Sequence, residues 1–148
     1  MRLFLILLVS FGLILSSCSK TRSDIKSYID KFYSNKSDFD KIVASLSADG
    51  TVMNRVGYFI NKNNLNKDVR DILDKLDITD ISTNSSDCKG IAQFQLEANW
   101  TTKEHIYFTK DSCDYEQTAK GYHKQTSEFI EVYGLGDNWL MWVDYDLL

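Results

Sequence analysis

The apolar residues of this 148-residue chain change their spacing near Asp77. Between Asp24 and Leu76 they recur every three or four positions, which is the spacing of amphipathic helices. After Asp77 they alternate with polar residues in several short runs, which is the pattern of strands that bury one face. Helices followed by consecutive hairpins predict an α+β domain, in which N-terminal helices pack on an antiparallel, hairpin-connected C-terminal sheet.

The helical part is expected to form several short helices. Residues 37–40, Ser-Asp-Phe-Asp, have the form of a capping box, which predicts a break between two helices near residues 35–37. Residues 52–60 are again spaced as a helix, and Asn66 is expected to cap a last short helix. The side chains expected to face inward are those of Ile25, Tyr28, Ile29, Phe32, Phe39, Ile42, Val43, Leu46, Val69, Ile72, Leu73 and Leu76.

The clearest strand pattern lies at residues 91–98, where apolar side chains alternate with glutamines and a glutamate. This alternation predicts a half-buried antiparallel strand with a wet outer face. Residues 105–109 are its expected hairpin partner, in a register that places Phe94 opposite Phe108. An earlier strand is expected over residues 78–83.

Further strands are expected over residues 115–123, 128–133 and 139–145, with the last two joined by a turn at residues 134–137. This order of elements is similar to the NTF2-like and cystatin-like folds, in which a curved sheet cups the helices. That resemblance implies a ligand pocket between the helices and the sheet.

The N-terminus has the three parts of an export signal. Arg2 supplies a positive start, and residues 3–15 form an apolar run too short to span a bilayer. The run ends in Leu15-Ser16-Ser17-Cys18, which resembles the lipobox of bacterial lipoproteins. The alternatives are an ordinary secretory signal with an incidental cysteine and an uncleaved membrane anchor.

The lipobox resemblance implies the domain organisation of the chain. Residues 1–17 would be a signal peptide that is removed, and Cys18 would carry acyl chains such as palmitate on its thiol and its new amine. Residues 18–23 would be a lipidated tether, and residues 24–148 a single α+β domain. Because Ser19 is not Asp, the likeness to lipoproteins of diderm bacteria implies a cell-envelope location, at the outer membrane facing the periplasm.

Two cysteines, Cys88 and Cys113, remain after lipidation. In an exported domain such a pair is expected to form a disulfide, which would stabilise the fold by about 3 kcal/mol. The competing interpretation is a zinc site that adds His105 and His123, but their spacing matches no known ligand pattern. The sequence therefore predicts a disulfide and no metal.

No catalytic motif is visible in the chain. Nucleophile elbows, phosphate-binding glycine loops and metalloprotease signatures are missing, and the sequence therefore predicts neither an enzyme nor a cofactor. His105 with a buried carboxylate is the one acid–base candidate. The net charge is −4 without a basic stripe, which argues against nucleic-acid binding.

The most unusual segment is residues 139–145, Trp-Leu-Met-Trp-Val-Asp-Tyr. We expect a central strand that is buried on both faces. If one face is open instead, Trp139 or Trp142 with Tyr133 and Tyr145 would form an aromatic interaction patch, because Trp and Tyr dominate interface hot spots.

The sequence therefore predicts a non-catalytic binding module held at the membrane surface by its lipid. Its partner would be an envelope protein, and one version of this hypothesis is an immunity-type inhibitor. The alternatives are a small-ligand carrier and an NTF2-like enzyme, both with a pocket between the helices and the curved sheet.

Overall fold

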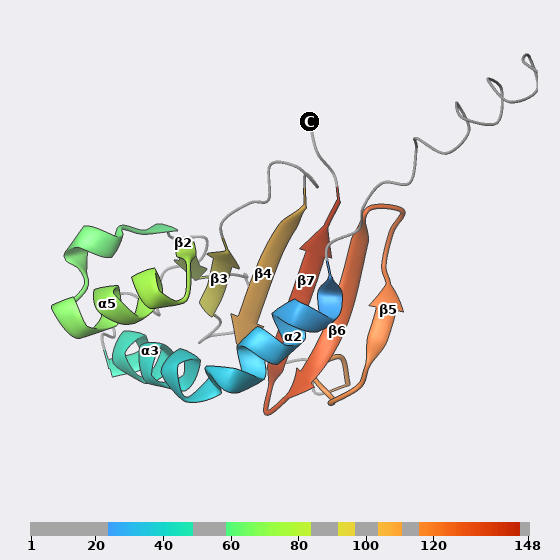
Figure 1. Cartoon of the computed structure of the whole chain (residues 1–148), viewed down its shortest axis with the longest axis horizontal. Coiled ribbons are helices and arrows are strands. Elements are labelled where there is room, and N and C mark those ends of the chain that lie inside the picture. Colours follow the sequence, from blue (N-terminus) through green and yellow to red (C-terminus); the bar gives the residue numbers. More distant parts are fainter. Residues whose placement is uncertain (1–23, 49–58, 84–91, 97–103, 111–115, 146–148) are drawn as a thin grey trace, which may run out of the picture.

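The computed structural model describes residues 24–48, 59–83, 92–96, 104–110 and 116–145. The helical elements are α2 (Ile25–Ser34), α3 (Lys36–Ala48), the short 3-10 helix η1 (Lys62–Asn64) and α5 (Lys67–Lys75). The strands are β1 (Phe59–Ile60), β2 (Ile78–Thr83), β3 (Ala92–Leu96), β4 (His105–Lys110), β5 (His123–Gln125), β6 (Ile130–Gly136) and β7 (Trp139–Asp144). Figure 1 shows the helices lying against the sheet.

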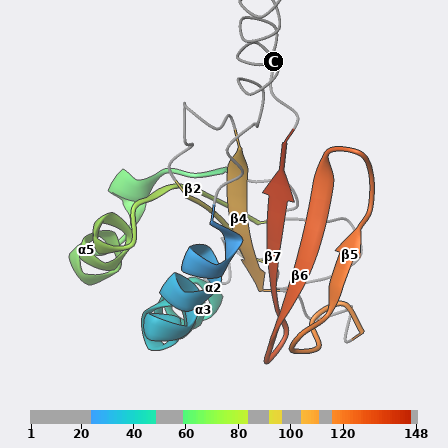
Figure 2. The same ribbon diagram turned by 45° about the vertical axis from the view of Figure 1, so that its right-hand side comes forward.

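The seven strands form one antiparallel sheet in the order β1-β2-β3-β4-β7-β6-β5. The last strand, β7, lies between β4 and β6. In Figure 2, α2, α3 and α5 are on one side of the sheet, and none of the described helices covers the other side. This architecture confirms the predicted α+β class with helices packed on an antiparallel sheet. Among the described residues, no helix is both long and apolar enough to cross a bilayer.

Aromatic side chains fill the layer between the helices and the sheet. Phe32 and Phe39 of the helices contact Phe94, Phe108 and Trp139 of three adjacent strands, with ring centroids 5.2 to 5.8 Å apart. All five side chains are fully buried. Burial of each such side chain stabilises the fold by roughly 2–3 kcal/mol. These five rings therefore occupy part of the layer in which the NTF2-like analogy predicted a pocket.

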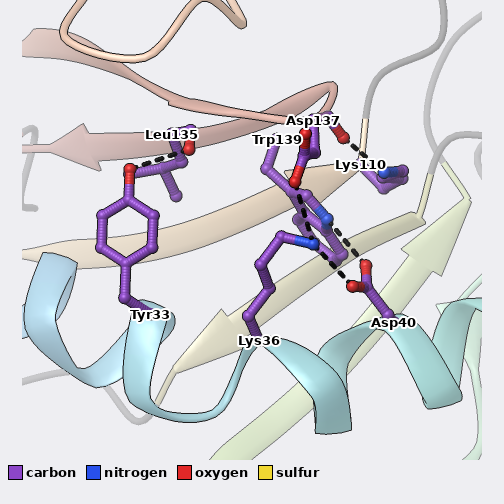
Figure 3. A network of polar contacts seen from close by, with 7 residues as sticks. All are labelled: Tyr33, Lys36, Asp40, Lys110, Leu135, Asp137 and Trp139. Carbon is purple, nitrogen blue, oxygen red and sulfur yellow. Dashed lines mark hydrogen bonds and ion pairs between the residues drawn. The ribbon is translucent and has the colours of Figure 1, made fainter.

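A polar network fastens α3 to the turn between β6 and β7 (Figure 3). Asp40 accepts hydrogen bonds from the indole Nε1 of Trp139 at 3.1 Å and from Nζ of Lys36 at 2.7 Å. Lys36 also pairs with Asp137 at 3.2 Å, and Nζ of Lys110 lies 5.2 Å from the centroid of the Trp139 ring. The network satisfies the polar atom of a fully buried tryptophan, which would otherwise be costly to bury.

The predicted helix boundaries are mostly confirmed. Asn35 lies between α2 and α3, at the predicted break. The side chain of Asn66 accepts a hydrogen bond from the Val69 amide at 2.9 Å, as expected of the residue that caps α5. The predicted capping box is wrong, because α3 already begins at Lys36 and Ser37 lies within its first turn. The inward-facing residues predicted for these helices are buried or pack against the core.

The predicted helix over residues 52–60 is wrong at its end. Phe59 and Ile60 form β1, whose register partners are Ser82 and Ile81 of β2. A short apolar run fits either period, and here pairing with a sheet edge prevails over local helical spacing. Residues 52–58 lie outside the described part of the chain.

The predicted hairpin register is confirmed. Phe94 of β3 is the partner of Phe108 in β4, and Gln95 is the partner of Tyr107. Both phenylalanines face the helices, so burial of this pair determines which face of each strand points inward. The strand predicted over residues 78–83 is β2.

The segment before β5 differs from the prediction. The described residues of 115–123 form turns up to position 122, and β5 begins only at His123. This segment runs along β6 so closely that a Cβ atom on Gly134 would lie 2.1 Å from the carbonyl oxygen of Ala119. Gly134 lies within β6 and not in the predicted turn. The turn is formed by Asp137 and Asn138, both with positive φ, as in tight hairpin turns.

Candidate binding face of the sheet

The face of the sheet that points away from the described helices carries a pocket of about 400 Å³. Strand alternation explains which side chains reach it. Trp139 contacts the helix residues Phe32 and Phe39, so Trp142, three positions later, points to the opposite face. We call this hollow the open-face pocket, and three rows of side chains across the strands line it.

The central row consists of Asp80, Gln95, Tyr107 and Trp142. Each is the register partner of the next, so the row crosses the four adjacent strands β2, β3, β4 and β7. Neighbouring strands lie about 4.8 Å apart, and side chains directly opposite each other are therefore in reach of one another. The row places a carboxylate, an amide and two aromatic rings in sequence along one line.

The two flanking rows complete the pocket. On one side lie Phe59, Ser82 and Gln93, which are also successive register partners, and Phe59 is 73% exposed at the edge strand. On the other side lie Asp144 of β7 and its partner Ile130 of β6. The pocket is therefore bounded by an exposed ring at one end and by a carboxylate and an aliphatic side chain at the other.

His105 supports the central row from beside the pocket. Its ring stacks on the ring of Tyr107, with centroids 6.3 Å apart and planes inclined by 24°. The side-chain Nε2 of Gln95 donates to Nδ1 of His105 at 3.3 Å. These two contacts hold the Tyr107 ring and the Gln95 amide in one orientation.

The described side chains that line the pocket carry negative charge. Among the described residues that line it, two are carboxylates, Asp80 and Asp144, and none is Lys or Arg. Burial raises the pKa of the Tyr107 hydroxyl above its ordinary value, and the charges of Asp144 and Asp80 raise this pKa further. Both carboxylates are therefore close enough to act on the centre of the pocket.

The predicted aromatic patch does not form as one surface. Trp139 is fully buried against the helices, whereas Trp142 is half-buried in the open-face pocket. Tyr133 and Tyr145 are partly buried and pack against the core. Including Trp139 in the patch was therefore wrong, and the expectation that residues 139–145 are buried on both faces is wrong at Trp142.

Sequence reasoning missed most of the pocket. Asp80, Gln95 and Tyr107 were not proposed as site residues, although the predicted pairing of Phe94 with Phe108 already implies that Gln95 lies opposite Tyr107. The sequence did not indicate that β4 pairs with β7. This pairing brings Trp142 beside Tyr107.

A second polar cluster lies on the helix side of the sheet, at β5 and β6. The His123 ring stacks on Tyr133, with centroids 4.4 Å apart and planes inclined by 16°. His123 Nε2 lies 3.4 Å from Oε2 of Glu131, and the Tyr133 hydroxyl donates to the same carboxylate. His123 therefore lies beside a buried carboxylate, the arrangement that the sequence predicted for His105.

The arrangement excludes a zinc site that uses both histidines. His105 lies on the open face of β4, and His123 lies on the helix side of β5, three strands away or about 14 Å. Among the described residues, no group of three or more His, Cys, Asp and Glu side chains is placed to hold a metal ion. Residues 1–23, which include Cys18, and the predicted disulfide partners Cys88 and Cys113 lie outside the described part.

The chain matches no protein-family model, no curated protein and no solved structure. The resemblances to the lipobox and to the NTF2-like and cystatin-like folds therefore stay predictions from sequence.

Proposed function

We propose that this protein is a lipid-anchored module of the bacterial envelope that binds a protein partner through the open-face pocket. The observation that carries the proposal is the convergence of Trp142, Tyr107 and hydrogen-bonding side chains in one pocket, on the face that no described helix covers. Trp and Tyr contribute most to protein interfaces when polar groups surround them.

The anchor rests on the sequence. A processed Cys18 with acyl chains would hold the protein at a membrane, because each buried CH₂ group contributes about 0.8 kcal/mol. The tether from residue 18 to 23 spans at most about 20 Å when extended, so the domain would work close to the bilayer. By the same resemblance, we place it at the outer membrane facing the periplasm.

Mass spectrometry of the protein from its native envelope tests the anchor. We expect a mature N-terminus at Cys18 that carries a diacylglyceryl thioether and an acylated amine. The Cys18→Ala protein, in the same membranes, is the control and should lack both groups. An intact Met1, or an unmodified thiol at Cys18, contradicts the proposal.

Site-specific photo-crosslinking in intact cells tests the binding face. A photoreactive amino acid is placed at Phe59, beside the pocket, and as a control at Lys67 on α5, whose side chain is similarly exposed at 75%. We expect a discrete crosslinked protein from position 59 that is absent from position 67 and is lost when Trp142→Ala is added. No product at position 59, or the same products at both positions, contradicts the proposal.

A further inference from the structure

We propose that the open-face pocket binds the guanidinium group of an arginine side chain that the protein partner presents. This inference rests on the proposed function and names the chemistry that the pocket recognises. It is drawn from the aromatic floor, the two carboxylates and the hydrogen-bond acceptors that line one pocket.

The aromatic floor comes from Tyr107 and Trp142. They are register partners on the adjacent strands β4 and β7, and both line the pocket. A guanidinium is planar and weakly hydrated, and it stacks on aromatic rings through cation–π attraction. Two neighbouring rings therefore offer a surface that suits this group.

The carboxylates provide the charge. Asp80 lies at one end of the central row, and Asp144 lies on β7 two positions after Trp142. The charges of both carboxylates act at Tyr107, so a cation that stacks on the rings would be attracted, whereas an anionic ligand would be repelled. A neutral sugar could also stack on the rings and donate hydroxyl hydrogen bonds to the carboxylates, but it brings no positive charge to balance theirs.

The remaining lining residues supply acceptors around this floor. The amides of Gln93 and Gln95 and the hydroxyl of Ser82 each contain an oxygen that can accept a hydrogen bond. A guanidinium has five N–H donors and no acceptor, so it matches a site rich in acceptors better than an ammonium with three donors.

Phe59 favours an arginine that belongs to a peptide segment over a free amino acid. Its ring is 73% exposed at the rim of the pocket and can contact an apolar residue that flanks the arginine. A free amino acid would instead bring a carboxylate toward two carboxylates. A pocket of about 400 Å³ falls in the size range of small-ligand sites and has room for one such side chain.

Calorimetric titration of the purified full-length lipoprotein in a non-ionic detergent tests the inference. The probes are an end-blocked Leu-Arg-Leu peptide and its citrulline counterpart, which has the same shape and no charge. We expect the arginine peptide to bind at least about tenfold more tightly, and its affinity to fall as salt is raised. Equal affinity for the two peptides overturns the inference.

Two variants with the same change in charge locate the binding. The Asp80→Asn/Asp144→Asn protein should lose at least about tenfold in affinity for the arginine peptide. The control is Asp30→Asn/Asp71→Asn, which removes two exposed carboxylates from α2 and α5 and should bind as the unmodified protein does. Circular dichroism melting of both variants verifies that they fold. An equal loss in both variants, or no loss in the first, overturns the inference.

Titration with free arginine and the crosslinking result show which proposal fails: the preference for a peptide, the guanidinium inference or the protein-binding function. Free arginine should bind more weakly than the peptide, and equal or tighter binding overturns the peptide part of the inference. If the Phe59 crosslink forms but no arginine peptide binds, the guanidinium inference fails and the protein-binding function stands. If the peptide binds but no crosslink forms in cells, the protein-binding function fails.

Discussion

The indole Nε1 of Trp139 donates a hydrogen bond of 3.1 Å to Asp40, although the two residues are 99 positions apart. This bond joins α3 to the first residue of β7 (Figure 3), and its donor belongs to a tryptophan that packs in the aromatic core. It couples the N-terminal helices to the strand that also places Trp142 in the open-face pocket.

Removing the acceptor should destabilise the fold. In the Asp40→Ala protein the buried Trp139 N–H loses its partner, and we expect a loss of about 1–3 kcal/mol in the free energy of unfolding. Asp40→Asn keeps an acceptor oxygen and should lose less. Urea denaturation measures both, with Asp71→Ala as an exposed control expected to change stability by no more than about 0.5 kcal/mol. Equal stability of the Asp40→Ala and control proteins would contradict this role.

Stability should fall in acid because of two carboxyls on α3. The hydrogen bond from Lys75 lowers the pKa of Asp38 below its usual 3.8. Burial alone would raise the pKa of Asp40, but hydrogen bonds from Lys36 and Trp139 outweigh it, and the net shift is downward. A carboxyl whose pKa is lower in the folded than in the unfolded state stabilises the fold above the unfolded pKa, and loses this effect as the pH falls through the folded pKa.

We therefore expect the urea midpoint to decline as the pH falls below about 4. In the Asp38→Asn/Asp40→Asn protein this decline should be shallower, since neither side chain can then take up a proton. A decline with the same slope in both proteins would assign the acid sensitivity to other groups.

Gly134 should tolerate no side chain. A Cβ atom there would lie 2.1 Å from the carbonyl oxygen of Ala119 and 2.6 Å from that of Gln117, and both atoms belong to the backbone. Gly134→Ala should therefore cost about 1–3 kcal/mol or more, because backbone must move. Gly121→Ala is the matched control, since its added Cβ meets nothing within 4 Å. Its expected loss of stability is about 1 kcal/mol and comes only from the positive φ that alanine must adopt there. Thermal unfolding compares the two, and a smaller loss for Gly134→Ala would contradict the close approach.

Cys88 and Cys113 should be joined in the exported protein. Peptide mapping without reduction is expected to recover the two cysteines in one linked fragment. The Cys88→Ser/Cys113→Ser protein should lose about 3 kcal/mol of stability, because the unfolded chain is no longer constrained. Recovery of both cysteines as free thiols from protein isolated from the envelope would refute the pairing.

Local sequence patterns determined the features that depend on near neighbours. Asn66 caps α5 through an amide three residues away, and the alternation around Phe94 and Phe108 aligns β3 with β4 across one hairpin. Both follow from short-range geometry and from the burial of one face, so the sequence predicted them correctly. The edge strand β1 was missed because its two residues, Phe59 and Ile60, acquire a strand partner only when β2 is in place.

The amino-acid sequence alone determined the α+β class, the helical period of α2, α3 and α5 and the register of the hairpin between β3 and β4. Only the tertiary structure decided that β7 enters the sheet between β4 and β6. It also decided that the described helices cover the face of the sheet that carries Trp139 and not the face that carries Trp142. Alternation specifies two opposite faces within a strand, but it does not say which face another element will bury. That choice depends on contacts between residues far apart in the chain, such as Asp40 and Trp139, whose free energy no local pattern encodes.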